Sequence, residues 1–391
     1  MARVTHFHPR KILDSRGFFT LEVGIILDDG TYAWASVPQG KSVGSYEAAH
    51  KDENDSIRAI ETIISPRVIG FEAGLQRSFD ELLITLDGMP DKSKLGGNTT
   101  LALSVAYARA SAIHSGRHLW QYLRDTADTI ARMPRLFVNL INGGLHAGNE
   151  LDLQEYLIIP KTNDIHEAVS ISVSMYHSLK ESLVAEKGSS AGNVGDEGGY
   201  APDMQDNLEP FRFLKLVGEA EGLWNLFDLG VDVAAGSTFM DARELRALYT
   251  EMRKEYDVRY IEDPFFEDDF QAFASLNKEI GGDTLICGDD LTTTNVDRMK
   301  KAHTAKSINS IIIKPNQIGT ITESIDAVEL ARTYGWQVVV SHRSGESNDD
   351  FIADFAYAVG ADGIKLGAPA RGERVAKYNR LLHIADIVEK L

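Results

Sequence analysis

Short apolar segments in the second half of the chain constrain its fold more than any other feature, because each one ends in a polar residue. The clearest is Ser310–Ile313, whose three consecutive isoleucines are typical of a strand buried on both faces. Lys314 follows it, and Pro315 lacks the backbone N–H that a sheet ladder needs. We therefore expect the strand to stop at Lys314. For this lysine alone, extension of its amine to solvent would be the simpler interpretation.

The same pattern recurs at intervals of 23 to 30 residues, which argues against that simpler interpretation. Such spacing accommodates a strand, a loop, a helix and a second loop, so it predicts successive βα units. Repeated units with polar residues at the strand ends are typical of an α/β (TIM-like) barrel whose site lies on that rim, and an open doubly wound sheet is the alternative. The polar residues that end the segments are Asp232, Glu262, Asp289, Lys314, His342 and Lys365.

A smaller α+β domain is expected before the barrel, since 391 residues exceed what one hydrophobic core usually organises. The predicted strands are residues 19–27 and 31–37, joined by a turn, and the predicted helices are residues 46–64, 75–86 and 98–113. Near residues 126–134 the helical pattern of the preceding part gives way to the apolar segments of the second part. We therefore divide it into an N-terminal α+β domain, residues 1–128, and a barrel domain, residues 129–391.

The charge balance bears on the class of partner. A net charge of −18 argues against nucleic acid or an anionic membrane as the main partner, although it does not exclude a small anionic substrate in a basic pocket. A single cysteine excludes an intramolecular disulfide, and no apolar run approaches the ~18 residues of a membrane span. Together with the polar start of the chain, these observations predict a cytoplasmic protein that binds neither nucleic acid nor membrane.

Two glycine-rich segments and one acid add candidate site residues. Paired glycines just before His146 indicate a loop whose backbone comes close to a ligand. Glu155 lies within an apolar run, where a buried carboxylate is costly unless it is paired. In residues 192–202 four glycines surround Asp196 and Glu197. A solvated acidic loop is the simpler alternative there, but an ordinary turn needs fewer special residues.

The three acids at successive strand ends would converge in a barrel and repel one another without a cation. Oxygen-only ligands favour a hard ion, Mg²⁺ or Mn²⁺, over zinc. Next around the ring come Lys314, Arg343 and Lys365, so an acidic half should face a basic half suited to a small, multiply anionic substrate.

A lysine beside a divalent cation and a second cation should have a lowered pKa, so Lys314 is a candidate general base. Removal of a proton α to a carboxylate requires both a base and a divalent cation, because the ene-diolate that forms carries an additional negative charge. Glu197 is then a candidate general acid on a leaving hydroxyl.

Several segments carry a recognisable set of motifs in order along the chain. They are Asp14-Ser15-Arg16-Gly17 and residues 142–155, 193–202, 261–265, 288–291, 314–319, 341–346 and 365–374. Together they resemble the enolase family, and residues 314–319 favour its archaeal members. The resemblance implies a lyase that dehydrates 2-phosphoglycerate to phosphoenolpyruvate in glycolysis, reversibly in gluconeogenesis. It also implies a barrel whose first strands depart from strict βα order, and a homodimer or an octamer built from dimers.

The resemblance further implies roles for single residues. Lys314 would take the C2 proton, and Glu197 would assist loss of the C3 hydroxyl. Asp232, Glu262 and Asp289 would hold a first Mg²⁺, and Ser42 would join the substrate phosphate on a second, which gives two ions per site during turnover. The residues implied at the substrate are Arg343 and Ser344 at its phosphate, Lys365 at its carboxylate, and His146, Glu155 and His342 along the pocket.

The chain departs from the family pattern in its first loop. Enolases typically have Ser-Gly-Ala-Ser-Thr-Gly where residues 39–44 read Gln-Gly-Lys-Ser-Val-Gly, so Lys41 adds a charge near the phosphate. Phe18 and Phe19 also replace the usual Asn-Pro. Two alternatives follow: a paralogue acting on a different phosphorylated or carboxylated acid, and a non-catalytic binding protein that retains the fold. The complete set of acids and bases argues against the second alternative.

Overall fold

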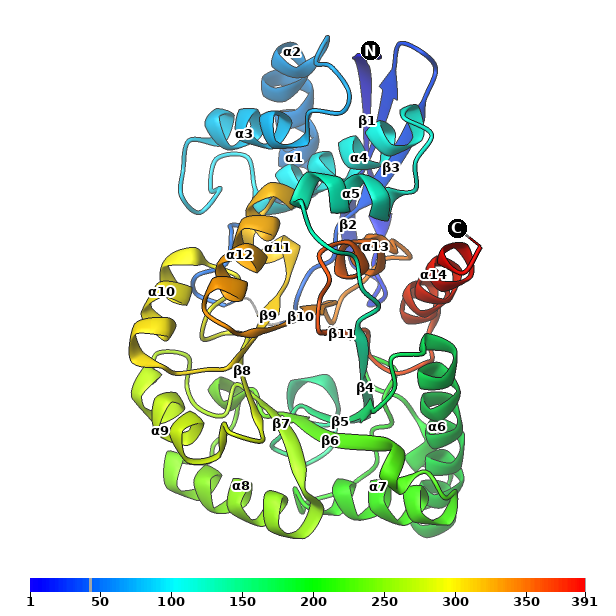
Figure 1. Ribbon diagram of the computed structural model, residues 1–391, viewed down its shortest axis with the longest axis vertical. Coiled ribbons are helices and arrows are strands. Elements are labelled where there is room, and N and C mark those ends of the chain that lie inside the picture. The colour runs from blue at the N-terminus through cyan, green and yellow to red at the C-terminus, as the bar shows by residue number, and fades with distance from the viewer. Residues whose placement is uncertain (42–43, 391) are drawn as a thin grey trace.

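The computed structural model describes residues 1–41 and 44–390, so the predicted ligand Ser42 lies outside the described residues. Figure 1 shows two parts, a sheet covered by helices α1 to α5 at one end and a barrel ringed by helices at the other. This arrangement confirms the predicted α/β fold class. Over the described residues, no helix is both long and apolar enough to cross a membrane.

The N-terminal sheet is antiparallel, with β2 in its centre. Its strands are β1 (Val4–Leu13), β2 (Phe19–Leu27) and β3 (Tyr32–Ser36). The hairpin between β2 and β3 is where the sequence predicts it. Strand β1 was not predicted, because its exposed face carries His6, His8 and other polar residues that hide its apolar side chains. Pro9 is compatible with β1 because an edge strand leaves some backbone donors unpaired.

Helix α4 is the centre of this domain and packs on β2 and β3. Its small and apolar residues are buried nearly all round, as a helix enclosed by other elements requires. The helical elements are α1 (Glu53–Ala59), a π-helical turn (Ile60–Ile64), α2 (Ser65–Val68), α3 (Gln76–Asp87), α4 (Gly97–His114) and α5 (Leu119–Ala127).

The predicted start of the first helix at residue 46 is wrong, because α1 begins after Asp52. The Asp52 side chain accepts a hydrogen bond from the Asn54 backbone N–H and caps the helix. Before that residue, the backbone N–H groups of Ala48 and Ala49 donate to carbonyls of Gln317 and Asp91, 2.7 Å away in both cases. Backbone donors that pair with distant segments are not free to form helical hydrogen bonds.

The second part is a closed barrel with the strand order β10-β11-β4-β5-β6-β7-β8-β9, so the alternative of an open doubly wound sheet is wrong. Its strands are β4 (Arg135–Asn142), β5 (Glu155–Pro160), β6 (Phe227–Asp232), β7 (Val258–Glu262), β8 (Leu285–Gly288), β9 (Ser310–Ile313), β10 (Gln337–Ser341) and β11 (Gly363–Lys365). Neighbours are parallel except on both sides of β5, which runs antiparallel to β4 and β6. The departure from strict βα order that the resemblance implies is thus present.

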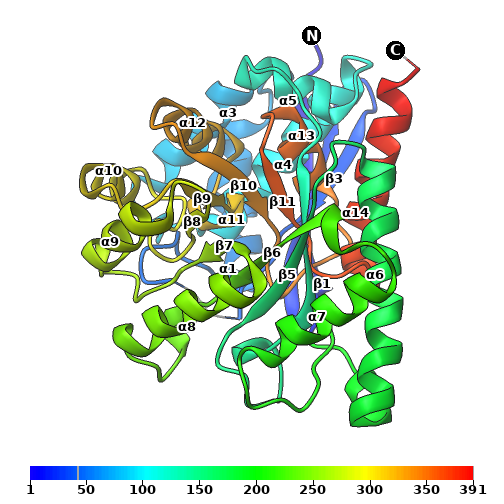
Figure 2. The ribbon, with the colours of Figure 1, turned by 60° about the horizontal axis from the view of Figure 1, so that its bottom comes forward.

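The longest helix of this part that the structure describes is α6, which lies beside α14 (Figure 2). The helices of this part are α6 (Ile165–Lys187), α7 (Glu209–Ala220), α8 (Ala242–Tyr256), α9 (Phe270–Ile280), α10 (Val296–Ala305), α11 (Pro315–Ile318), α12 (Ile321–Thr333), α13 (Phe351–Ala358) and α14 (Gly372–Val388). Short 3₁₀ turns cover Gly144–His146, Ser189–Gly192, Trp224–Leu226 and Ala235–Ser237.

The reversed strand β5 explains why an acid at the start of a strand reaches the site. In a parallel barrel the carboxyl ends of the strands share one rim, and an antiparallel strand presents its first residue there instead. Glu155 opens β5 and pairs in register with Asp232, which ends β6; Asp232 in turn pairs with Glu262 at the end of β7. Three carboxylates therefore lie side by side on the rim.

The barrel interior is a packed core and not a channel. Phe137 and Tyr260 meet edge to face with their ring centroids 4.9 Å apart, and the apolar layer also contains Ile312 of β9. Tyr260 also donates a hydrogen bond from its hydroxyl to Glu262 on the rim above. The floor of the rim is therefore rigid and shielded from water, which increases the cost of every unpaired charge above it.

A buried ion pair joins the two parts. Arg109 of α4 donates to both carboxylate oxygens of Asp349 at 2.7 and 2.9 Å, and the backbone N–H of Ser36 in β3 donates to the same carboxylate at 3.0 Å. Both charged side chains are at most 14% exposed. Burial opposes ionisation of Asp349, but Arg109 outweighs burial, so the pKa of Asp349 is lowered.

We predict that Arg109→Met lowers the free energy of unfolding by about 3 kcal/mol, because it leaves a buried carboxylate without its partner. The control is Arg77→Met, which removes a half-exposed pair with Asp326 and should cost less than about 1 kcal/mol. Urea denaturation measures both. Because the pKa of Asp349 is lowered, the Arg109 contribution is present above pH 3.8 and is lost as pH falls below that value. Equal losses for the two variants at pH 7 would contradict the structural importance of this pair.

Candidate active site

The rim of the barrel forms a polar pocket in which most of the predicted site residues meet. Those that line it are His146, Glu155, Glu197, Asp232, Asp289, Lys314, His342, Arg343, Ser344 and Lys365. Glu262 lies just beneath them and is fully buried. Residues far apart in the sequence are thus brought to one place by the strand ends of the barrel and by the loops that follow them.

Lys365 lies among the acids rather than across the pocket from them, which differs from the expected division into an acidic and a basic half. Its ammonium nitrogen is 2.8 Å from Glu262 Oε2, 3.2 Å from Asp232 Oδ2 and 3.2 Å from Glu155 Oε2, and these side chains are at most 5% exposed. Burial lowers the pKa of Lys365, but the carboxylates around it outweigh burial and raise that pKa well above its ordinary value. The amine is therefore charged.

The acids around Lys365 cannot all be ionised, since one ammonium balances one carboxylate and the site is shielded from water. Burial and the nearby Glu197 raise the pKa of Glu155 well above its ordinary value. Burial and the neighbouring Asp232 raise the pKa of Glu262 to about 8. Such a group of acids holds protons that a divalent cation would displace.

Lys314 follows β9 and pairs with Asp289, which follows β8. Its ammonium donates to Asp289 Oδ2, and the Gln317 side chain donates to Asp289 Oδ1 at 3.2 Å. Burial lowers the pKa of Lys314, but Asp289 outweighs burial and the pKa is raised. The lowered pKa that the sequence predicts is therefore not a property of the protein side chains alone. A metal ion that competed with the lysine for Asp289 would lower the pKa of Lys314 again.

One cluster of acids at the rim contains two residues that the sequence pattern did not single out. Asp263, Asp289 and Asp290 each bring one carboxylate oxygen to within 4.8 Å of the others. Asp263 accepts hydrogen bonds from the backbone N–H groups of Asp289 and Asp290, at 3.0 and 2.6 Å. Burial and the neighbouring acids raise the pKa of Asp263 well above its ordinary value and that of Asp290 to about 7. The available signal was their position, directly after Glu262 and Asp289 in the sequence.

These donor sets fit a hard divalent cation. The acids that line or underlie the pocket offer oxygen ligands. Burial and mutual repulsion make ionisation of several of these acids unfavourable, so they hold protons. A bound Mg²⁺ would balance the negative charge and make ionisation favourable. Among the described residues, one other set brings three ligand atoms within 4.8 Å, namely His146, Glu155 and Glu197. Because that set includes an imidazole, it suits Mg²⁺ less well than the carboxylates do.

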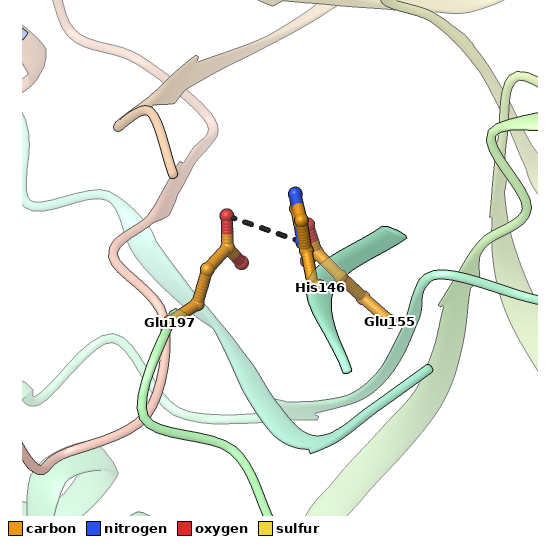
Figure 3. Close-up of side chains that lie close together, drawn as sticks. All are labelled: His146, Glu155 and Glu197. Atoms are coloured by element: carbon orange, nitrogen blue, oxygen red, sulfur yellow. Dashed lines mark ion pairs between the residues drawn. The ribbon is translucent and has the colours of Figure 1, made fainter. Parts of the chain in front are cut away.

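Glu197 is buried and lies beside His146 (Figure 3), with His342 near its other carboxylate oxygen. One carboxylate oxygen lies 3.6 Å from His146 Nδ1, and the other lies 3.5 Å from His342 Nε2. The Asn139 side chain donates to the latter oxygen at 3.2 Å. Burial lowers the pKa of His146 and lowers that of His342 to about 3, so both imidazoles are neutral at pH 7.

Arg374 fixes the tautomer of His342 and was missed as a site residue, although it lies in an enolase-like segment. Its guanidinium can only donate, and its Nη1 lies 2.6 Å from His342 Nδ1. The ring proton is therefore on Nε2, the atom that faces Glu197. Arg374 is fully buried and also donates to the backbone carbonyls of Arg343 and Ser344, both at 2.6 Å. It orients one wall of the pocket.

The glycines around Glu197 let two loops pack closely. A Cβ on Gly195 would lie 2.6 Å from the carbonyl oxygen of His146, which is closer than a carbon atom can approach. The backbone N–H of Asp196 donates to that same carbonyl at 3.3 Å. The glycine-rich segment therefore holds Glu197 beside His146.

The N-terminal domain closes one side of the pocket. Glu47 accepts both arms of the Arg343 guanidinium at 2.8 and 3.0 Å, and both side chains are at most 6% exposed. The backbone N–H of Lys41 donates to Ser344 Oγ at 2.7 Å. Glu47 was not predicted, because its partner lies 296 residues away in the sequence.

Comparisons with known proteins agree with the motifs. The family model of the enolase N-terminal domain matches residues 4–123, and that of the enolase C-terminal TIM barrel domain matches residues 130–244 and 237–390. The chain is 43% identical to the enolase of Methanopyrus kandleri, with 99% of this chain and 96% of that protein covered. It is 42% identical to the enolase of Aeropyrum pernix, with coverage of 97% and 93%. Identity to enolase B of Dictyostelium discoideum is 39%, with coverage of 98% and 94%.

We predict that Mg²⁺ binding releases protons at pH 7 and strengthens from pH 6 to pH 8, because Glu262 and Asp290 have pKa values raised to about 8 and about 7. Calorimetric titration in two buffers of different ionisation enthalpy measures the number of protons released. Glu262→Gln should release fewer. Without Mg²⁺, the raised pKa of Glu262 makes its contribution to stability fall as pH rises from about 4.5 to about 8. Identical heats in both buffers would contradict the raised pKa values.

Proposed function

The chain belongs to the enolase family, and from that membership we propose which of its residues carry the reaction. The protein is a lyase of glycolysis that converts 2-phosphoglycerate to phosphoenolpyruvate, removing a proton from C2 and the hydroxyl from C3. The observation that most supports the residue assignment is the pocket itself. It combines a buried lysine, a buried glutamate between two histidines, and adjoining acids on one rim.

Lys314 is the base that takes the C2 proton. Its amine lines the pocket, and its side chain is 13% exposed, so it can reach a substrate without being hydrated on all sides. The amine accepts a proton only when neutral, and its ion pair with Asp289 opposes that state. A metal ion bound to Asp289 would compete with the Lys314 amine for that carboxylate and would favour the neutral amine.

Glu197 assists the departure of the C3 hydroxyl: in its protonated form it donates the proton with which the hydroxyl leaves as water. Burial raises the pKa of Glu197, but His146 and His342 outweigh burial and lower it well below its ordinary value, so the negative charge of a bound substrate would have to raise it. The Nε2–H of His342 and the amide of Asn139 both face the same carboxylate oxygen, so the side chain is held in one orientation. Arg374 donates to the opposite ring nitrogen of His342. Because burial lowers the pKa of His342 to about 3, the imidazole stays neutral at neutral pH and keeps this orientation. His146 lies against the second oxygen.

Enolases depend on Mg²⁺, and the acids of this pocket are candidate ligands. We assign Asp232, Glu262 and Asp289 to the first ion and two ions to the site during turnover, with Ser42 at the second. When bound, the ions supply electrostatic stabilisation of the negative charge that develops on the substrate carboxylate. We assign Lys365 to the substrate carboxylate; its ion pairs with Asp232 and Glu262 would weaken if those two acids held the metal ion.

Arg343 and Ser344 bind the substrate phosphate. A guanidinium matches two oxygens of a phosphate, and Glu47 holds the guanidinium of Arg343 in place at the pocket wall. His146, Glu155 and His342 line the pocket around the reacting carbons. The first loop contributes its Lys41 backbone N–H to Ser344, so substrate binding and the position of that loop are linked.

The wider assignment includes a quaternary state, a compartment and a domain boundary. We propose a homodimer or an octamer built from dimers, supported by the apolar side chains of Leu13, Phe18 and Phe19, which are close in sequence and 56 to 63% exposed.

We also propose that the protein is cytoplasmic, because it is an enzyme of glycolysis. We divide the chain into a domain of residues 1–128 and a barrel domain of residues 129–391, with β4 as the first barrel strand.

We predict that Lys314→Ala lowers kcat for 2-phosphoglycerate by about 10³-fold or more, because the reaction loses its base. Glu197→Gln should lose a comparable factor, and the exposed Lys278→Ala should lose none. Formation of the phosphoenolpyruvate double bond is followed by ultraviolet absorbance. Substrate deuterated at C2 separates the roles: Glu197→Gln should still exchange deuterium with water, and Lys314→Ala should not. Near-normal turnover by Lys314→Ala, with an intact fold, would disprove its assignment as the base.

A further inference from the structure

Residues 39–41 of the first loop are docked on the barrel segment that contains Ser344. Gln39 and Gly345 exchange two backbone hydrogen bonds at 2.9 and 3.0 Å, and Arg16 donates to the Gln39 carbonyl at 3.1 Å. The backbone N–H of Lys41 then bonds Ser344 Oγ at 2.7 Å. The Cα of Lys41 is therefore held at the edge of the pocket, and its side chain starts from a fixed point.

The Lys41 side chain crosses the mouth of the pocket to two other loops. Its ammonium donates to the Leu145 backbone carbonyl at 2.6 Å and to Asp196 Oδ2 at 3.0 Å. Leu145 immediately precedes His146, and Asp196 immediately precedes Glu197. One side chain thus joins three loops that are 104 and 155 residues apart in the sequence. The alanine that enolases typically have at this position could not make these contacts.

We propose that Lys41 is a positioning residue that ties these three loops together and thereby holds Glu197 and His146 in their relative places. The proposal rests on the assigned roles of those two residues. Lys41 acts on the solvent side of the glycine-rich loop, where its side chain is 44% exposed and that of Asp196 is 28% exposed. On the inner side, the Asp196 backbone carbonyl accepts from Arg374 at 3.2 Å. The loop is therefore held from both sides.

A direct role for Lys41 at the substrate is the competing explanation, since its residue lines the pocket. The geometry favours the tether, because the ammonium already has a carboxylate and a carbonyl as acceptors. The two explanations predict opposite effects of Asp196→Asn. Loss of a tether should reduce turnover, whereas release of a substrate-binding cation from its carboxylate should strengthen substrate binding.

The kinetic test compares Lys41→Met, Asp196→Asn and the double variant. We expect each to lower kcat by about fivefold with KM nearly unchanged, in keeping with the modest strength of a half-exposed ion pair, and the double variant to lose no more than either single one. Lys41→Arg should recover most of the activity. Lys187→Met is the matched control, because Lys187 also joins a carboxylate and a carbonyl, those of Glu209 and Asp203, but lies outside the pocket. It should leave kcat and KM unchanged.

Hydrogen exchange of the free protein gives a second readout that does not depend on turnover. In Lys41→Met the backbone amides of Gly195, Asp196 and Gly198 should exchange faster, because their bonds join the glycine-rich loop to itself and to His146. Unchanged exchange, or a raised KM in Lys41→Met with a lowered KM in Asp196→Asn, would overturn the tether. Failure of the proposed function is a separate result: the wild type would not turn over 2-phosphoglycerate, while the exchange difference could still be measured.

Discussion

The imbalance between buried carboxylates and ammonium groups is the constraint on which the rest of the pocket depends. Lys365 faces Glu155, Asp232 and Glu262 at 2.8 to 3.2 Å, and Lys314 is paired with Asp289. Two amines cannot balance this number of carboxylates away from water, so protons remain on some of the acids. A site of this kind gains from a divalent cation, which agrees with the Mg²⁺ dependence of the family. It also explains why both lysines have raised pKa values in the protein alone.

The barrel makes this imbalance tolerable because it fixes every member of the group from below. The reversed strand β5 brings Glu155 into register with Asp232 and Glu262, and the packed layer of Tyr260 and Phe137 prevents the rim from relaxing. A carboxylate on a flexible loop would turn towards water instead of remaining desolvated. Rigid strand ends therefore carry the acids, whereas loops carry Glu197, His146, Arg343 and Ser344.

The loops in turn depend on contacts between the two domains. Glu47 binds Arg343, Lys41 reaches Leu145 and Asp196, and the Arg109–Asp349 pair also joins the two domains. The pocket is completed by segments from both domains, so its shape follows from their docking as much as from the barrel. The substitution of lysine for the usual alanine in the first loop places an additional tie at this junction.

Local sequence pattern determined the repeated βα units, their strand ends and the residues that those ends present, whereas closure into a barrel was decided by the structure. An apolar run followed by a polar residue indicates a buried strand and its carboxyl end, because both the burial of a strand and the turn after it depend on a few neighbouring residues. Asp232, Glu262, Asp289, Lys314 and Lys365 could therefore be identified from the sequence alone. The resemblance of longer segments to enolases added the reaction, which the comparisons support across nearly the full chain.

The tertiary structure alone decided how those residues pair. It placed Lys365 among the acids, raised the pKa of Lys314, and brought Glu47 and Arg374 into contact with the pocket. The first helix starts at Glu53 and not at the predicted residue 46, because the backbone N–H groups of Ala48 and Ala49 donate to distant carbonyls. Each of these outcomes depends on atoms that are remote in sequence and close in space. Charge pairing and desolvation act through space, so no local pattern records them.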